Sequence, residues 1–192
     1  TLRKGNLEEQ ACDLLIVNGF SDWQDFGGAT KAVDARFEGR LLNIAKEEGF
    51  KGKTSETLLV RTFDGFPAKR ILLVGLGDRK DFSAQVVREV SATAYQTAKK
   101  IRANTVVSIL HGAGFGKLPA VDAARAQVEG VRLGAYEFVK LKKTPEEKPH
   151  EVRSWEIVTN HDDHLRAGKR GMELGDMVAR GTIFARDLVN ET

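Results

Sequence analysis

The stretch RILLVGLG, residues 70–77, decides the fold. Its apolar run does not alternate with polar residues, which is typical of a strand covered on both faces of a sheet. Gly75 and Gly77 follow at once and predict a tight turn at the end of this strand, because glycine tolerates backbone angles that other residues avoid. Four further apolar segments are predicted strands: residues 11–17, 57–61, 105–110 and 154–158.

Between these strands, apolar residues recur at spacings of three and four, which predicts amphipathic helices. The predicted helices cover residues 30–48, 83–101, 120–139 and 165–189. Asp81 and Ser83 are candidate N-caps of the second helix, and Pro119 precedes the third. This alternation of strands and helices predicts a three-layer α/β domain with a largely parallel or mixed sheet.

The last predicted helix has two apolar faces. One face carries Met172, Ala179 and Ile183, and the other carries Leu174, Val178, Ala185 and Leu188. Such a helix needs a neighbour on each side. The polar segment before it, residues 140–153, holds two of the four prolines and is predicted to be an exposed linker or loop.

The composition excludes several classes of protein. The 192 residues are 41% apolar and 30% charged, which is ordinary for a globular protein that needs neither disulfides nor metals to fold. The single cysteine, Cys12, excludes an internal disulfide and fits a reducing compartment. No apolar run approaches the roughly 20 residues that span a bilayer, and the first ten residues lack the apolar core of a signal peptide. We therefore expect a cytoplasmic protein without a membrane partner.

Three glycine-containing segments are candidates for anion binding. Residues 75–78 lack the third glycine of a dinucleotide fingerprint, because Lys80 stands in its place. Residues 111–117, HGAGFGK, lack the spacing of a phosphate-binding P-loop. Residues 26–30, FGGAT, precede a predicted helix whose first backbone amides can hold an anion. A simple turn is the favoured interpretation of all three, and an anion site at residues 26–30 stays open.

One cluster offers potential metal ligands: His161, Asp162, Asp163 and His164. The two aspartates also stand where the last helix is predicted to begin, so capping explains them without a metal. His111 and His150 lie in predicted loops, and no spacing ties them to this cluster.

The chain shows no catalytic constellation. Cys12 lies in a predicted buried strand with no histidine nearby in the sequence, so a buried apolar side chain is favoured over a nucleophile. We therefore predict no catalytic and no metal-binding residue in this chain, and we assign no binding residue.

Three segments stand in a characteristic order: TSETLLVRTFDGFPAKRILLVGLGD at residues 54–78, EGVRLGAYEFVKLKK at 129–143 and ARDLVNE at 185–191. In this order they resemble the cytosolic leucyl aminopeptidase family, the M17 metallopeptidases. The resemblance covers nearly the whole chain. Thr192 departs from it, because many members have proline there.

The resemblance implies an N-terminal macro-domain-like α/β domain over residues 1–160. It also implies a linker helix over residues 161–192, an interdomain helix that leads to the chain's own C-terminal catalytic domain. In the whole enzyme, two divalent metal ions, zinc or manganese, would activate water to release N-terminal residues from peptide substrates. The family's metal ligands and catalytic residues belong to the C-terminal domain, and their motifs are absent from this sequence, so no cofactor is expected in this chain. Members are hexamers in which the N-terminal domain serves assembly and shields the active sites.

The leading hypothesis is thus the non-catalytic N-terminal domain of a leucyl aminopeptidase, and two alternatives stay open. Glycines 27, 28, 112, 114 and 116 follow predicted strands, which suits a stand-alone macro-like module for ADP-ribose or a related nucleotide, although fold is a weak guide to function. The net charge of +3, with both signs interleaved, permits DNA binding without requiring it.

Overall fold

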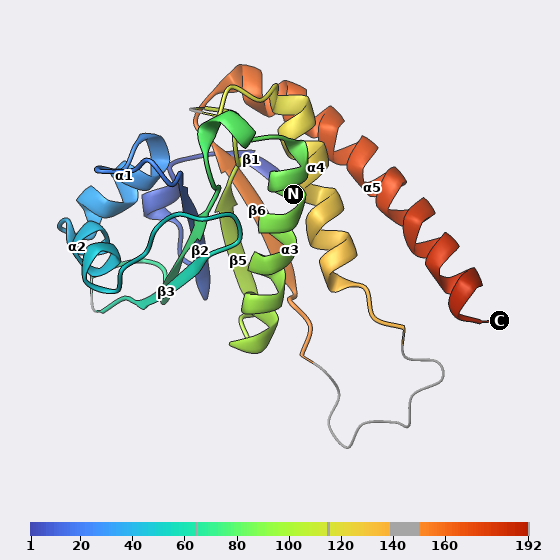
Figure 1. Cartoon of the computed structure of the whole chain (residues 1–192), viewed down its shortest axis with the longest axis horizontal. Helices are drawn as coiled ribbons and strands as arrows, with labels where there is room; N and C mark the ends of the chain where they lie inside the picture. The colour runs from blue at the N-terminus through green and yellow to red at the C-terminus, as the bar shows by residue number, and fades with distance from the viewer. Residues whose placement is uncertain (64, 115, 139–149, 192) are drawn as a thin grey trace.

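A six-stranded mixed sheet forms the centre of the molecule (Figure 1), in a computed structural model that describes residues 1–63, 65–114, 116–138 and 150–191. Its strands are β1 (Leu2–Lys4), β2 (Leu14–Gly19), β3 (Thr57–Arg61), β4 (Arg70–Gly75), β5 (Thr105–Ile109) and β6 (Ser154–Thr159). They lie in the order β1-β6-β5-β2-β4-β3. All neighbouring strands run parallel except β3 and β4, which are antiparallel. The predicted mixed α/β sheet is confirmed.

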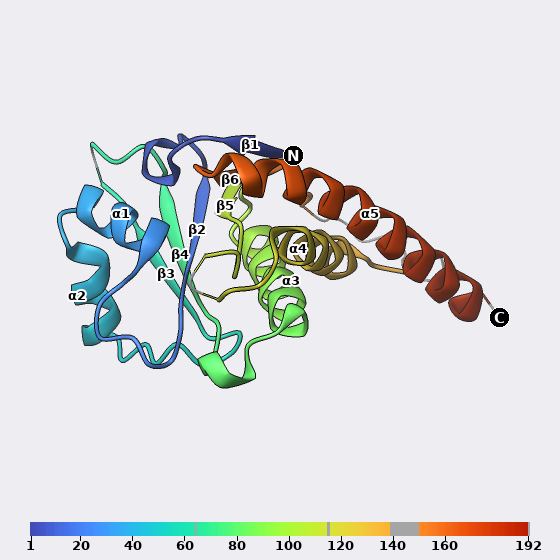
Figure 2. The same cartoon turned by 90° about the horizontal axis from the view of Figure 1, so that it is seen from above.

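Helices cover both faces of this sheet. They are α1 (Gly28–Arg36), α2 (Arg40–Glu47), α3 (Ala84–Lys100), α4 (Ala120–Ala135) and α5 (Asp162–Asn190), with short 3-10 turns at Leu7–Glu9 and Arg79–Asp81. Seen from above, α1 and α2 lie on one side of the sheet and α3 and α4 on the other, with α5 packed outside α4 (Figure 2). This is the predicted three-layer architecture.

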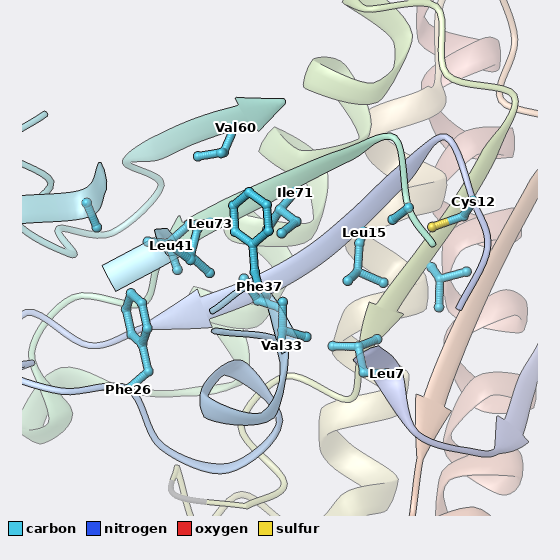
Figure 3. Close-up of a cluster of buried hydrophobic side chains, with 14 of the residues drawn as sticks. Leu7, Cys12, Leu15, Phe26, Val33, Phe37, Leu41, Val60, Ile71 and Leu73 are labelled. Atoms are coloured by element: carbon cyan, nitrogen blue, oxygen red, sulfur yellow. The ribbon is translucent and has the colours of Figure 1, made fainter. Parts of the chain in front are cut away.

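Strands β2 and β4 lie side by side inside the sheet, and the apolar runs in their sequences do not alternate with polar residues. One set of their side chains, including Leu15 and Leu73, packs against α1 and α2 in the cluster drawn in Figure 3. The other set, including Ile16 and Leu72, packs against α3. Because both faces are covered, apolar residues stand at four successive positions in each strand, residues 14–17 in β2 and 71–74 in β4. A third cluster under α4 joins Leu2 of β1, Ile157 of β6 and Leu110, the residue that follows β5.

Several predicted boundaries were wrong. Residues 30–48 do not form one helix, because Glu38 and Gly39 adopt left-handed angles (φ 60° and 73°) that end α1 and start α2. The first predicted strand, residues 11–17, begins only at Leu14. The predicted helix over residues 120–139 ends at Ala135, because Tyr136 is extended, and residue 139 lies outside the described residues. Ser83 is the N-cap of α3, although its side chain makes no capping hydrogen bond, and Asp81 lies in the preceding 3-10 turn.

The edge strand β1 was not predicted. It has three residues, of which only Leu2 is buried, so it carries no readable periodicity. Most of the predicted linker, residues 140–149, lies outside the described residues.

Helix α5 has one buried face and one exposed face with apolar residues, but its residues differ from those predicted: of the first predicted face only Ala179 is buried, and Met177 and Phe184 on the exposed face were not predicted. Its buried face consists of small residues: Gly168, Gly171, Gly175 and Ala179. A Cβ atom on Gly171 would lie 2.1 Å from the backbone oxygen of Val121 in α4, so glycine is required for this close approach. The opposite face is apolar and exposed to solvent, and the last turns of α5 extend beyond α4 (Figure 1). No helix among the described residues combines the length and hydropathy needed to cross a membrane.

Candidate cleft at the carboxyl ends of the strands

A cleft of about 540 Å³ opens beyond the carboxyl ends of β2, β5 and β6. Its lining comes from segments far apart in the sequence: residues 5–8, 27–30, 109–110, 112–114 and 158–161 contribute to it. Parallel strands deliver the loops that follow them to one edge of the sheet, where ligands of α/β proteins commonly bind. The volume lies within the range of small-molecule sites, about 300–1,000 Å³.

Asn18, near the end of β2, connects two walls of the cleft through hydrogen bonds. The Thr30 hydroxyl donates to the Asn18 backbone oxygen at 2.8 Å, and the Asn18 backbone N–H donates to the same hydroxyl at 3.4 Å. The Asn18 side chain reaches the other way, with its amide nitrogen 2.9 Å from Nδ1 of His111. One residue thereby fixes the start of α1 and the loop after β5.

His111 is a fully buried, neutral imidazole at neutral pH. Burial lowers its pKa from 6.5 to about 4. Since an amide nitrogen only donates, Nδ1 accepts from Asn18 and the ring proton sits on Nε2. Nε2 has no hydrogen-bond partner among the described residues. The buried side chain of Gln127 secures the same loop, because its Oε1 accepts from the His111 backbone N–H at 3.2 Å and its Nε2 donates to the Ile109 oxygen at 3.0 Å.

The predicted anion loop at residues 26–30 forms one wall of the cleft. Gly27 is the N-cap of α1, and its lack of a side chain leaves the first turn without a side-chain cap. The backbone N–H groups of Gly28, Ala29 and Thr30 donate no hydrogen bond to any described residue. These donors, at the positive end of the helix dipole, are suited to an anion.

The loop HGAGFGK forms the facing wall. Gly112 and Gly116 are required by packing, because a Cβ atom on either would lie within 2.6 Å of the Phe82 ring. Gly114, by contrast, has open space around its Cα. The backbone N–H groups of Gly112, Ala113, Gly114 and Gly116 also donate to no described residue. The interpretation as a strand-to-helix turn is therefore correct, and the turn additionally exposes donors to the cleft.

The histidine pair of the HDDH cluster lies at the rim of the same cleft. His161 and His164 line it, and their ring centres are 4.8 Å apart. Asp162 and Asp163 fall in the first turn of α5, where Asp162 pairs with Lys4 at 2.8 Å. Among the described residues, no group of three or more His, Cys, Asp or Glu side chains could hold a metal ion. Metal ions of the kind that the resemblance implies therefore find no fitting site in the described part of this chain.

The other singled-out residues lie apart from the cleft. Gly75 and Gly77 make the predicted tight turn: Gly77 has φ 73°, and a Cβ atom on Gly75 would lie 2.0 Å from the Lys53 oxygen. Cys12 is buried in the core, and burial raises the pKa of its thiol to about 12, as expected of a structural residue. His150 contacts the Ala103 backbone oxygen at 2.9 Å and does not line the cleft.

Sequence reasoning missed Asn18 and the segment after β1 that includes Gly5–Glu8. Asn18 had a detectable signal, because a polar residue ends an apolar strand at the edge where ligands bind. The segment after β1 had none, since that strand was not recognised.

Comparisons with known proteins identify the family. The model of the cytosol aminopeptidase family, N-terminal domain, matches residues 19–145. The probable cytosol aminopeptidase of Alkaliphilus oremlandii is 28% identical over 188 residues, which is 98% of this chain and 38% of that protein. The corresponding protein of Thermosynechococcus vestitus is 37% identical and covers 82% of this chain and 31% of its own length. The chain thus spans about a third of the curated relatives that it matches.

Solved structures agree on the fold. A mutant of tomato leucine aminopeptidase matches with a TM-score of 0.77 at 24% identity, covering 98% of this chain and 37% of that one. A Trypanosoma brucei macrodomain in complex with ADP-ribose matches with a TM-score of 0.67 at 18% identity, covering 88% of this chain and 67% of that one. At these identities the likeness shows the fold alone, which is the predicted macro-domain-like fold. By its sequence match to the family model, the chain belongs to the cytosol aminopeptidase family and represents its N-terminal domain.

Proposed function

We propose that this chain is the non-catalytic N-terminal domain of a cytoplasmic aminopeptidase that releases N-terminal residues, leucine among them, from peptides. Membership of the family supports the aminopeptidase assignment. The chain spans about a third of its relatives' length, which supports a longer protein whose catalytic domain is separate from this one. The two divalent ions, zinc or manganese, and the catalytic residues belong in this proposal to the remaining two thirds.

The observation that carries the proposal is the exposed face of α5. Met177, Phe184 and Leu188 are 61%, 64% and 53% exposed. They stand at positions i, i+7 and i+11 of one helix, and therefore form a single stripe. The small-residue face of α5 already packs on α4, so the stripe points away from this domain.

The occupant of this stripe, in our proposal, is the catalytic domain of the same polypeptide. Large apolar side chains arranged along one exposed helix face mark an interaction surface. The position fits, because the final turns of α5 extend beyond α4, away from the sheet (Figure 2). We accordingly assign residues 1–160 to the α/β domain and 161–192 to a linker helix, with the α/β domain serving hexamer assembly and shielding of the active sites.

The family match favours this role over a stand-alone ADP-ribose module and over a DNA-binding module. The relatives are aminopeptidases that align with up to 98% of this chain. A DNA-binding role has no support beyond the small net charge.

A double variant of the stripe tests the proposal. In the complete gene product, Phe184→Ser with Leu188→Ser should lower the stability of the assembled enzyme and its aminopeptidase activity together. In residues 1–192 alone, the same pair should leave the free energy of unfolding nearly unchanged, because both side chains are exposed. Lys169→Ser, an exposed change on the same helix, is the matched control. Normal activity and assembly in the double variant would refute the proposed docking.

A further inference from the structure

The two edges of the sheet, at β1 and at β3, differ in their protection. Strand β1 has three residues, and two of them, Arg3 and Lys4, are charged and exposed. Short, charged edges of this kind discourage pairing with a further strand. Strand β3 has five residues, contains neither lysine nor proline, and pairs only with β4 among the described strands. Its outer edge can therefore accept a further strand.

The ladder between β3 and β4 indicates which backbone groups of β3 point outwards. The Thr62 N–H, directly after β3, donates to the Lys69 oxygen at 3.2 Å. Successive residues of an antiparallel strand turn their N–H and C=O groups alternately to one neighbour and to the other. Even-numbered residues of β3 therefore bond to β4, and the backbone groups of Thr57, Leu59 and Arg61 face the free edge.

One face of this edge also carries exposed apolar side chains. Leu59 is 40% exposed, and Phe63, which follows the strand, is 70% exposed. The opposite face is already occupied, because Leu58 and Val60 pack in the core beneath α1 and α2. A strand that pairs with β3 would therefore find both unpaired backbone groups and an apolar side chain at Leu59.

A second copy of this chain fits the edge in one antiparallel register. Because the outward-facing groups belong to odd-numbered residues, a two-fold axis can lie at Thr57, Leu59 or Arg61. An axis at Arg61 sets two guanidinium groups opposite each other, and an axis at Thr57 sets Arg61 opposite Lys53. Like charges directly opposite are destabilising. An axis at Leu59 instead pairs leucine with leucine and Arg61 with Thr57, so no like charges meet.

We propose that β3 pairs antiparallel with β3 of a second copy, and that a two-fold axis at Leu59 relates the two chains. The interface is then the same surface on both copies. It is short, so we expect a weak dimer of the isolated chain. This inference concerns self-association of the α/β domain and does not depend on the aminopeptidase role, because dimerisation is read on residues 1–192 without substrate.

Sedimentation equilibrium of residues 1–192 and of the variants Leu59→Lys and Leu59→Glu tests the proposal. We expect the unchanged chain to dimerise with rising concentration. Each variant alone should dimerise roughly tenfold or more weakly, because the axis sets like charges opposite each other. An equimolar mixture of the two variants should regain dimers, since opposite charges then face each other.

Three results of this experiment would overturn the proposal. The first is an unchanged chain that stays monomeric at millimolar concentration. The second is a charged variant that dimerises as well as the unchanged chain. The third is a mixture that associates no better than its two components, because residue 59 would then not lie opposite its own copy.

The matched control is Leu188→Lys, which changes another exposed leucine, on α5. It should leave dimerisation unchanged. If Leu188→Lys abolished the dimer and Leu59→Lys did not, the contact would lie at α5 and the proposal would fail. Thermal melts should show that both variants stay folded, because both side chains are exposed.

Amide hydrogen exchange separates strand pairing from a contact between side chains alone. As the dimer forms, exchange should slow at Thr57, Leu59 and Arg61, whose N–H groups gain partners. The N–H groups of Leu58 and Val60 already bond to β4 and should be protected in the monomer. Unchanged exchange at Leu59 in a dimeric sample would refute the strand pairing.

Discussion

Replacing Gly171 by alanine tests how closely α5 packs on α4. The added Cβ atom would lie 2.1 Å from the backbone oxygen of Val121, against 3.4 Å for an ordinary contact. The helices must therefore separate locally by about 1.3 Å, because a backbone oxygen cannot rotate away. Gly175 lies one turn later, and a Cβ atom added to it would lie 2.6 Å from the Arg125 backbone oxygen. Separation of the helices at Gly171 would therefore also loosen the packing at Gly175.

The magnitude follows from two opposing effects. Overpacking costs about 1–3 kcal/mol, and this contact with a rigid atom belongs at the upper end. Alanine in place of glycine returns up to about 1 kcal/mol of helix propensity. We expect a net loss of about 2 kcal/mol, which lowers the melting temperature by about 4–8 °C in a domain of this size.

Gly181→Ala is the matched control on the same helix. Its Cβ atom would meet nothing within 4 Å, so only the propensity effect remains. We expect a gain of up to about 1 kcal/mol. Urea denaturation followed by circular dichroism at 222 nm measures both variants at pH 7. If Gly171→Ala proved as stable as Gly181→Ala, α5 would not lie against α4 as described.

Three further predictions concern titratable groups. The folded pKa of His111, about 4, lies below its unfolded value of 6.5, so the unfolded state binds more protons between these pH values. Acidification from pH 6.5 to 4 should cost up to about 3 kcal/mol, and His111→Gln should flatten that slope. Cys12 should resist a thiol reagent at pH 8 in the native chain and react fully in urea, since burial raises the pKa of its thiol to about 12; fast native labelling would contradict its burial. The Asp13 carboxylate accepts hydrogen bonds from Lys69 at 2.6 Å and from the Asn104 backbone N–H at 2.9 Å, which lowers its pKa to about 2. In urea titrations at pH 7, Asp13→Asn should therefore lower the free energy of unfolding by about 1 kcal/mol, and this difference should vanish as the pH falls through 2. Equal stability of the two proteins at pH 7 would speak against the pairing.

The layered core was predictable because its cause is local. The runs at β2 and β4 are apolar at successive positions, and both faces of these strands are buried. The faces of α5 were predictable only in part: apolar spacing indicated that the helix needs two neighbours, but the buried face is formed mainly by glycines, which an apolar pattern does not reveal.

The break between α1 and α2 could not be predicted from the spacing of the apolar residues. Val33, Phe37 and Leu41 all pack in one cluster, so their spacing of four continues across the break. Gly39, with its positive φ, was the available signal for two helices.

The cleft could be predicted only in pieces. The loops at residues 26–30 and 111–117 were each recognised as possible anion loops, but their meeting depends on β2 and β5 being neighbours in the sheet. The two strands are about 90 residues apart in the sequence, and no local sequence pattern indicates that they pair. Thr30 and His111, which join both loops to Asn18, are single polar residues whose role appears only in three dimensions.

Hydrolysis of a leucine chromogenic substrate, with zinc or manganese added, tests the central claim most directly. The assay compares purified residues 1–192 with the complete product of the source gene at equal molar concentration. We expect turnover by the complete product and none by residues 1–192. Turnover that co-purifies with the 21.2 kDa chain, or a complete product without aminopeptidase activity under both metals, would contradict it.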